Sequence, residues 1–463
     1  MSNLFTSLTS ATRALEAQRF GLDVAGQNIA NVNTPGYARR AVDLVSSKPD
    51  SPFNVGRGAE VAGVRSLRDQ LLDARLGREV TAQRREAAVA EALSVVEASL
   101  GEAGSSIDAA LVGFFDAFGP LAENPASAVA RQDVLLRGAS LASAFGDMSS
   151  RFEMARTDAD RHVRGAVAEI NALAERIASL NGAIGAAATA EASLHLRDDL
   201  SVALRQLSEL TDADMLVRAD GGADVSIGPG QPLVVGGAAY AVAVESTAPS
   251  GLAALTLGGT PLAGTIEGGR LGGLMHVRDT LIPGYQQDLD TLAFEVAAQV
   301  NAAHEAGFDL DGAAGEPFFT FNAPLAGVSG GAAAALQVTD TLAADGRLIA
   351  AAGTPTPGDN TAARALAALR EARVLDGGSA TLVDGWAQLV YVVGRDVRTA
   401  EGARDSRAEI VRQVDALRDE VSGVSLDEEA MMLMKFQRAY EANAKFFTVI
   451  DQAIQTLLNA MAR

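Results

Sequence analysis

Residues 426–461 read LDEEAMMLMKFQRAYEANAKFFTVIDQAIQTLLNAM, and the organisation of the whole chain follows from this stretch. Its apolar side chains recur every three or four positions, and Asn443 is the one polar residue in the series. On a helix, this spacing puts them along one narrow seam and leaves the charged and amide side chains on the other faces. The predicted seam consists of Leu433, Phe436, Tyr440, Phe447, Ile450, Ile454, Leu457 and Met461.

The N-terminal thirty residues have a matching pattern. A helix with one narrow apolar seam cannot bury that seam alone in water. We therefore expect the two chain ends to pack on each other and on copies of the chain, so that they form an assembly seam. The same spacing also fits two terminal helices that only close a helical domain, and spacing alone leaves both interpretations open. The N-terminal seam consists of Leu8, Leu15, Leu22 and Ile29, which are seven apart, with Leu4, Ala11 and Ala25 at the alternate position beside Gln18.

Length and composition exclude several classes of protein. A chain of 463 residues is too long for one core, so we expect two to four domains. The formal net charge of -20 argues against nucleic-acid partners and against binding to an anionic membrane surface. The sequence contains no apolar run near the roughly 20 residues that span a bilayer, and its start, MSNLFTSLTS, lacks the features of a Sec signal. Cysteine is absent, which excludes disulfides and thiolate chemistry.

The first half of the chain reads as mainly helical. A first helix over 3–31 must stop before Thr34, because Pro35 follows it, and Pro35-Gly36 fits the central pair of a type II turn. An extended region reaches about residue 64, and helices are predicted over 66–100 and 106–118, the latter stopped by Gly119-Pro120. A helix of about 55 residues then follows Pro125, which at 1.5 Å per residue is roughly 80 Å long. Residues 189–210 should fold back on it.

The second half alternates between strand and helix patterns. Short strands separated by Gly and Pro turns are predicted in 211–265, and a second β-like piece in 315–353. Helices are predicted over 270–306, 361–373 and 380–420. The fold class is thus α+β and multidomain, an elongated nested architecture with terminal coiled-coil-like helices, a long helical-bundle domain and β-rich inserts. The expected division is 1–45 with 424–463 (terminal helical assembly domain), 46–210 with 266–314 and 358–423 (helical rod), and 211–265 and 315–357 (β-rich inserts).

No pattern argues for an enzyme, a cofactor or a metal. Ser329 lies in a formal G-x-S-x-G match within a small-residue loop, without the strand and helix that a nucleophile elbow needs. Asp309 begins a DLDG sequence, but position twelve is Thr320, so the EF-hand pattern fails and a turn is expected. Glu428 lies three residues after Ser425 and fits a capping box. The histidines, none of them at ligand spacing, are His162, His195, His276 and His304.

The terminal motifs resemble those of the axial proteins of the bacterial flagellum. The run GQNIANVNTPGY over 26–37 is similar to their signature N-x-x-N-x-x-T-P-G-Y, and SGVSLDEE over 422–429 with FQRAYEAN over 436–443 is similar to S-x-V-x-x-x-E-E…Y-Q-x-A-Y-x-A. Met432 departs from the Asn common in the family, and Phe436 replaces the usual Tyr. The residues that carry the resemblance are Asn28, Asn31, Thr34, Pro35, Gly36, Tyr37, Glu428, Glu429, Gln437 and Tyr440.

The middle of the chain resembles the family of the first hook-associated protein, FlgK. The similar runs are VNAAH at 300–304, GFDLDG at 307–312, GEPFF at 315–319 and GDN at 358–360, and the long helical block at 125–210 favours the same family. A hook or distal rod subunit is the alternative, and it would lack that helical block. A surface adhesin is disfavoured, because 211–265 offers Tyr240 as its one aromatic residue.

The resemblance implies a structural adaptor at the hook-filament junction, outside the cell. It implies secretion through the flagellar type III export apparatus without a Sec signal peptide, and self-assembly through the terminal helices. The implied partners are copies of the chain in a ring or helical layer, the hook protein, the other junction hook-associated protein and, before secretion, an export chaperone at the C-terminal seam. No nucleic acid, membrane or cofactor is implied.

Overall fold

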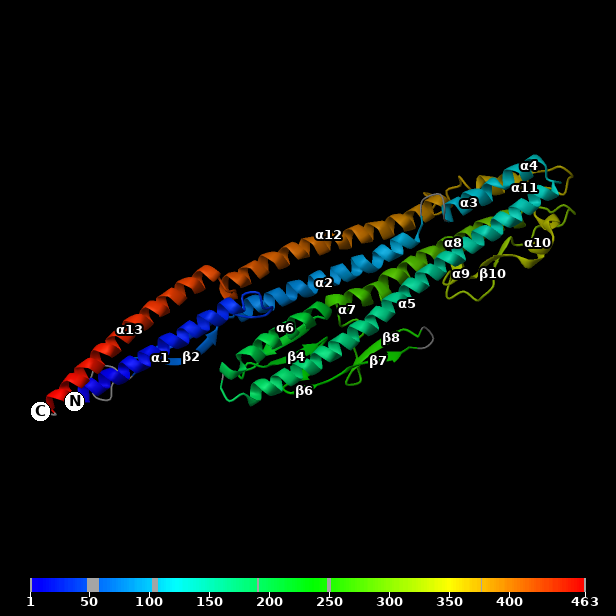
Figure 1. Cartoon of the computed structure of the whole chain (residues 1–463). Coiled ribbons are helices and arrows are strands. Elements are labelled where there is room, and N and C mark those ends of the chain that lie inside the picture. The colour runs from blue at the N-terminus through cyan, green and yellow to red at the C-terminus, as the bar shows by residue number, and fades with distance from the viewer. Residues whose placement is uncertain are drawn as a thin grey trace.

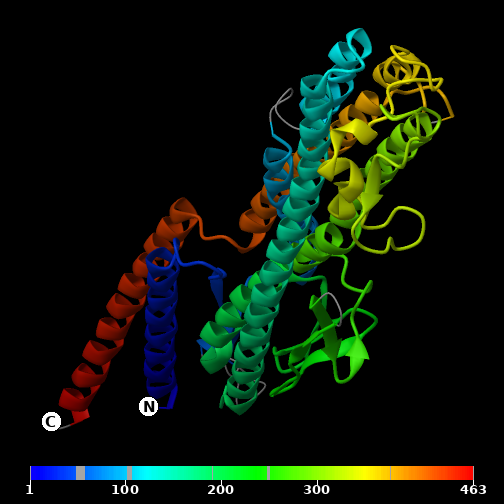
Figure 2. The same cartoon turned by 90° about the vertical axis from the view of Figure 1, so that its right-hand side faces the viewer.

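The molecule is elongated, and its two ends lie together at one extremity (Figure 1). The computed structural model describes residues 2–47, 58–101, 107–189, 191–247, 251–375 and 377–461, with the side chains of 6–460 within these ranges. Long helices run along a rod, and the two terminal helices form a separate pair set at an angle to it (Figures 1 and 2). The predicted α+β, multidomain class is confirmed, since small antiparallel sheets accompany the long helices.

Both terminal helices form as predicted. α1 (Ser2–Ala30) and α13 (Leu426–Met461) pack along each other. An antiparallel hairpin of β1 (Arg40–Ser46) and β2 (Ala59–Ser66), with a bulge between Asp43 and Leu44, packs on α1. Because α1, β1, β2 and α13 contact each other far more than they contact the rod, we call them the terminal module.

The rod is built on α5 (Ala128–Ala186), whose 59 residues correspond to a length of about 90 Å and confirm the predicted long helix. Ser127 caps it by accepting a hydrogen bond from the Ala130 amide, and apolar side chains are buried along its length. α6 (Leu194–Leu210), after the short η1 (Glu191–Ser193), folds back on α5 as predicted. The other long helices of the rod are α2 (Gln70–Ser99), α8 (Ile282–Glu305) and α12 (Leu382–Ser422).

The end of the rod far from the termini holds the largest aromatic core. Phe114, Phe115, Phe118, Phe318 and Phe319 are all fully buried there, with ring centroids 4.9–6.4 Å apart. The helix predicted over 106–118 forms as α3 (Ile107–Asp116), but Gly119-Pro120 does not stop it, because both residues lie inside the next helix, α4 (Phe118–Glu123). Pro120 falls in the first turn of α4, where an amide has no intrahelical acceptor, so proline costs nothing. The helices at this end are α3, α4 and α11 (Thr361–Ala368), the last ending earlier than predicted.

The segment 211–265 forms two antiparallel sheets that pack on α5. The predicted pattern of short strands separated by turns is confirmed. One sheet contains β3 (Ala213–Val217), β4 (Ala223–Ile227), β5 (Gln231–Val235) and β6 (Ala238–Ala239). The other contains β7 (Val242–Ser246), β8 (Ala253–Leu257) and β9 (Thr260–Pro261).

Three polar side chains of α5 attach these sheets to the rod through backbone hydrogen bonds. Asp160 accepts from the Ala253 amide at 2.7 Å. Asn171 exchanges two bonds with the Val242 backbone, at 2.8 and 3.0 Å. Asn181 does the same with the Ala223 backbone, at 2.7 and 2.9 Å. Steps of eleven and ten residues are about three helical turns, so all three side chains lie on one face of α5.

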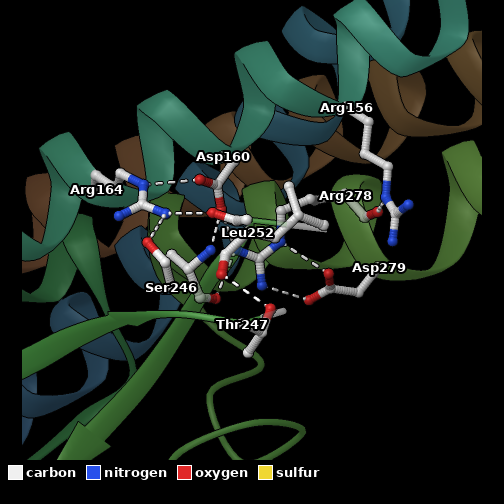
Figure 3. A network of polar contacts seen from close by, with 10 residues as sticks. Arg156, Asp160, Arg164, Ser246, Thr247, Leu252, Arg278 and Asp279 are labelled. Carbon is white, nitrogen blue, oxygen red and sulfur yellow. Dashed lines mark hydrogen bonds and ion pairs between the residues drawn. The ribbon is translucent and has the colours of Figure 1, made fainter. Parts of the chain in front are cut away.

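The short π-helix η2 (Val277–Leu281) joins α7 (Gly269–His276) to α8. An ion-pair network holds η2 against α5 (Figure 3). The buried Arg278 donates to Asp160 at 2.6 Å and to both oxygens of Asp279 at 2.8 Å. Arg164 donates to the other oxygen of Asp160 at 2.8 Å. Burial acts to raise the pKa of Asp160, but the bonds from Ala253, Arg164 and Arg278 outweigh it and hold that pKa below its ordinary value.

The segment 315–357 is more irregular than the β-rich piece predicted from its sequence. Its strands β10 (Phe319–Phe321) and β11 (Leu336–Val338) have three residues each, and the rest is loop or short helix. The composition misleads because the alanines serve close packing: Ala332 and Ala333 are fully buried on a helix that packs on α5 and α8. The short helices are α9 (Ala332–Ala335), α10 (Asp340–Ala344) and η3 (Gly346–Leu348).

Candidate functional site: the terminal helix pair and its motif cluster

Small residues allow α1 and α13 to approach closely. On α1 the buried positions are Ala11, Ala17, Gly21, Val24, Ala25 and Asn28. The ring of Phe436 lies over Gly21, where a Cβ atom would be 2.6–2.7 Å from three ring carbons. That distance is too short for any side chain, so glycine is required at position 21 for this packing.

The predicted seam residues are only partly covered in a single chain. Phe436 and Ile450 are buried, whereas Tyr440 and Leu457 are exposed. The line of leucines on α1 borders the small-residue face instead of forming its centre, because the helices approach at Gly21 and the alanines. The half-buried seam residues are Leu8, Leu15, Leu22, Ile29, Leu433, Phe447 and Ile454, and the side chains of Leu4 and Met461 lie outside the described residues.

A second side of α13, which points away from α1, also carries exposed apolar side chains. Met431, Met434, Phe446 and Val449 are 50–62% exposed and lie on this side together with the exposed Ala442 and Ala453, while the exposed Lys435 and Arg438 lie on the same side between Met434 and Ala442. We call the six apolar residues the outer face of α13. Half-buried Met432, the residue that departs from the family pattern, does not belong to it. A helix with apolar side chains on two faces can pack against two partners at once.

Asn28 is the centre of a buried polar cluster that joins the two sequence motifs. It is 1% exposed, and its Nδ2 donates to Glu429 Oε2 at 3.1 Å and to the Arg40 carbonyl at 2.9 Å. Its Oδ1 accepts from the Tyr37 hydroxyl at 2.8 Å and from the Arg40 amide at 3.0 Å. One side chain therefore bonds the turn, the first strand and the last helix, and all four of its bonds are used. Burial raises the pKa of Tyr37, so its hydroxyl stays protonated.

Arg39 binds the two adjacent glutamates of α13. Its Nε donates to Glu429 Oε1 at 2.6 Å, and its Nη1 donates to Glu428 Oε2 at 2.5 Å. The predicted capping box is only half formed: Ser425 Oγ accepts from the Glu428 amide at 3.5 Å, but the Glu428 carboxylate turns to Arg39. An ion pair with a half-buried arginine competes well against a weak backbone bond.

The remaining motif residues shape the turn or lie on the surface. Thr34 donates to the Asn31 side chain at 3.1 Å, and Gly36 has the positive φ of +77° expected after Pro35 in a type II turn. Gln437 is exposed and makes a long contact of 3.5 Å with Glu441. Sequence reasoning missed Arg39 and Arg40. The available signal was two arginines directly after one motif and two glutamates in the other.

The other polar residues singled out in the sequence have structural roles. Ser329 Oγ accepts from Gln287 Nε2 at 3.0 Å, and Asp309 accepts two backbone amides within its own turn. His304 is fully buried; its Nε2 accepts from the Ala350 amide and its Nδ1–H donates to the Glu316 carbonyl. Among the described residues, three or more potential metal ligands nowhere gather into a group. Within the same ranges, no helix combines the length and apolarity needed to cross a membrane.

Three sequence families match the chain in the order of its parts. Residues 93–319 match the family described as the flagellar hook-associated protein FlgK helical domain. Residues 8–37 match a flagella basal body rod protein family, and residues 417–460 match the C-terminal family of the flagellar basal body rod FlgEFG proteins. The two rod-protein matches therefore contain Asn28 and Glu429, the two residues that meet in the buried cluster.

Whole proteins match over nearly their full length. The chain is 26% identical to flagellar hook-associated protein 1 of Bacillus subtilis, over 100% of this chain and 99% of that protein. It is 25% identical to flagellar hook-associated protein 1 of Escherichia coli, over 99% and 100%. A solved structure of the flagellar hook junction protein FlgK from Burkholderia pseudomallei has the same fold, with a TM-score of 0.66 and 17% identity over 75% of this chain and 100% of that one. The chain therefore belongs to the FlgK family of flagellar hook-associated proteins.

Proposed function

We propose that this chain is the structural adaptor that joins the flagellar hook to the filament, and that it assembles through its terminal helices. The observation that carries the proposal is the outer face of α13. Burying an apolar side chain contributes about 1.5–3 kcal/mol, so four large exposed side chains on one helix represent a substantial driving force for association. Copies of the chain in a ring or helical layer, the hook protein and the other junction hook-associated protein are the proposed partners.

Charge favours association at the same end of the molecule. Residues 1–47 and 424–463 together contain eight Lys and Arg and eight Asp and Glu, so the whole formal charge of -20 lies in the remaining residues. Copies can therefore pack at their neutral ends, while the acidic rods repel each other and stay separate.

A substitution on the outer face tests assembly directly. Phe446→Glu and Val449→Glu place a charge on side chains that are already exposed, so the monomer should keep its circular dichroism spectrum. Complementation of a strain lacking the gene should then fail, with flagellin lost to the medium. Gln455→Glu, at an exposed polar position of the same helix that lies off the outer face, is the matched control and should restore filaments. Wild-type motility with both outer-face variants would refute assembly through this face.

Electron microscopy of cells lacking the gene separates the adaptor from its alternative, a hook or distal rod subunit. Complete hooks without filaments are expected for an adaptor, whereas basal bodies without hooks would indicate the alternative. The match of 93–319 to the FlgK helical domain favours the adaptor. We also propose that the chain divides as its sequence suggests, into a terminal part, a helical rod and inserts at 211–265 and 315–357.

Before secretion, we propose, the chain is unfolded for the flagellar type III export apparatus and an export chaperone holds the C-terminal seam. A chain without cysteine forms no disulfide that could obstruct threading, and a groove that binds an amphipathic helix would use anchors such as Phe447. Phe447→Glu should weaken binding to the purified chaperone, and Gln452→Glu should not. The absence of any effect of Phe447→Glu would exclude this residue as an anchor. We propose no catalytic role and no cofactor.

A further inference from the structure

The chain crosses between the terminal module and the rod twice, at 66–69 and at 422–425. Backbone bonds tie both crossings to Arg39 of the module: the Arg39 amide donates to the Ser422 carbonyl at 2.9 Å, and the Leu67 amide donates to the Arg39 carbonyl at 2.8 Å. Such short crossings hold the module close to the rod. They do not by themselves set its angle, which depends on side chains that reach from one part to the other.

Asp198 of α6 binds two arginines from outside the rod's helices, Arg40 at the start of β1 and Arg68 in the crossing between β2 and α2. Its Oδ2 accepts from Arg40 Nη2 at 3.1 Å, and its Oδ1 accepts from Arg68 Nη2 at 3.1 Å. The three side chains are only 15–22% exposed, so solvent screens these ion pairs less than it screens pairs on an open surface. Each arginine comes from a different segment, one following the turn and one preceding α2.

The turn of the N-terminal motif rests on the same part of α6. Arg68 Nη2 also donates to the Gly36 carbonyl at 2.8 Å. A Cβ atom at Gly36 would lie 2.3 Å from Val202 Cγ2 and 3.3 Å from the Asp198 carbonyl oxygen. The turn thus touches the surface of α6 within one helical turn of Asp198, and the close fit leaves little room for rocking.

Arg40 connects this contact to the buried motif cluster. Its backbone bonds twice to Asn28, while its guanidinium lies 4.9 Å from the centre of the Tyr37 ring and reaches Asp198. A movement of the module at Asp198 would therefore disturb the residues that hold α1 and α13 together. Glu191 next to Val64 forms a further contact with the hairpin, but its side chain is exposed.

We infer that Asp198 is a positioning residue that sets the angle at which the terminal module leaves the rod. The paired arginines and the turn around Gly36 supply three contacts to one short stretch of α6. Removing the carboxylate charge takes away two of them at once. The inference goes beyond the proposed function, because it concerns the geometry of the single chain and holds whether or not the chain joins hook to filament.

The chain contains no cysteine, so two can be introduced for spin labels without removing any. Lys435→Cys on α13 and Ser179→Cys on α5 place labels at exposed positions of the module and the rod. In the otherwise native full-length monomer, pulsed electron paramagnetic resonance should give one narrow distance distribution. Asp198→Asn, which keeps the shape of the side chain, should broaden it, and Arg68→Gln should do the same. Asp199→Asn, at the exposed neighbouring position, is the matched control and should leave it unchanged.

A narrow, unshifted distribution with Asp198→Asn would overturn the inference, and so would a broad distribution in the parent. Circular dichroism establishes that each variant keeps its helices, so broadening cannot arise from unfolding. Because the distances are measured in monomers, failure of the proposed adaptor role would appear only in the cellular assays and would leave this result standing.

Discussion

Replacing Asn28 by Asp tests whether the amide of Asn28 faces Glu429. The change preserves shape and the two bonds that Oδ1 accepts, from Tyr37 and Arg40. It converts the donor Nδ2, 3.1 Å from Glu429 Oε2, into an oxygen that faces a carboxylate. The hydrogen-bond network fixes which end of the Asn28 amide is oxygen and which is nitrogen, and only one orientation satisfies all four bonds.

The size of the effect follows from the burial of both groups, since Asn28 is 1% and Glu429 2% exposed. Losing a hydrogen bond to a charged group costs about 1.5–3 kcal/mol. Two like charges at this separation repel by about 5 kcal/mol at an effective dielectric constant of about 20, a ceiling that protonation of one carboxylate would lower. We therefore expect the terminal module of Asn28→Asp to be destabilised by about 3–5 kcal/mol at neutral pH. The loss should shrink as pH falls, because protonating either carboxylate removes the repulsion.

Native-state hydrogen exchange of the amides over 28–40 and 426–436 measures this loss where it occurs. Asn33→Asp, at an exposed position in the same turn, is the matched control and should leave protection unchanged. Adding Glu429→Gln to Asn28→Asp should restore part of the protection, because the glutamine amide can donate to the new carboxylate while Arg39 keeps Glu428. Equal protection in Asn28→Asp and Asn33→Asp, or a purely additive double variant, would refute the reasoning.

Three further predictions concern the turn, the rod and its buried histidine. Gly36→Ala should destabilise the terminal module by more than about 1 kcal/mol, since it adds a Cβ atom at positive φ against Val202. Gly26→Ala, in open space on α1, is the control and should be neutral or stabilising by up to about 1 kcal/mol. Hydrogen exchange of the terminal module measures both changes. Arg278→Met leaves the buried Asp160 carboxylate without its closest partner and should lower the free energy of unfolding by about 3–5 kcal/mol, as measured with denaturant. Arg270→Met breaks an exposed ion pair with Glu169 and should lower it by less than about 1 kcal/mol. Burial lowers the pKa of His304 from 6.5 to about 4, so the folded chain favours the neutral ring. The free energy of unfolding should therefore be highest above pH 6.5 and should fall by up to about 3 kcal/mol as pH falls towards 4. A His304→Gln variant should lose that part of the pH dependence of thermal unfolding.

The helices and the strands of the first insert could be predicted because their signals are local. The seam spacing of α13, the buried line of α5 and the Gly-punctuated strands β5 and β8 are all properties of neighbouring residues. The turn at Pro35-Gly36 is equally local, since a positive φ at that position requires glycine in the sequence itself. Motif positions at both ends were also identifiable, although their partners were not.

The sequence by itself therefore determined the long helices, the presence of short strands in 211–265, and that two apolar helices occupy the chain ends. Only the tertiary structure decided which side chains meet. Asn28 and Glu429 are 401 residues apart, and nothing near either residue in the chain indicates the other. The same holds for Arg40 and Asp198, for the three polar side chains of α5 that bind strand backbones, and for Phe436 over Gly21. Local spacing fixes the face on which a side chain lies, whereas its partner depends on how distant elements are brought together.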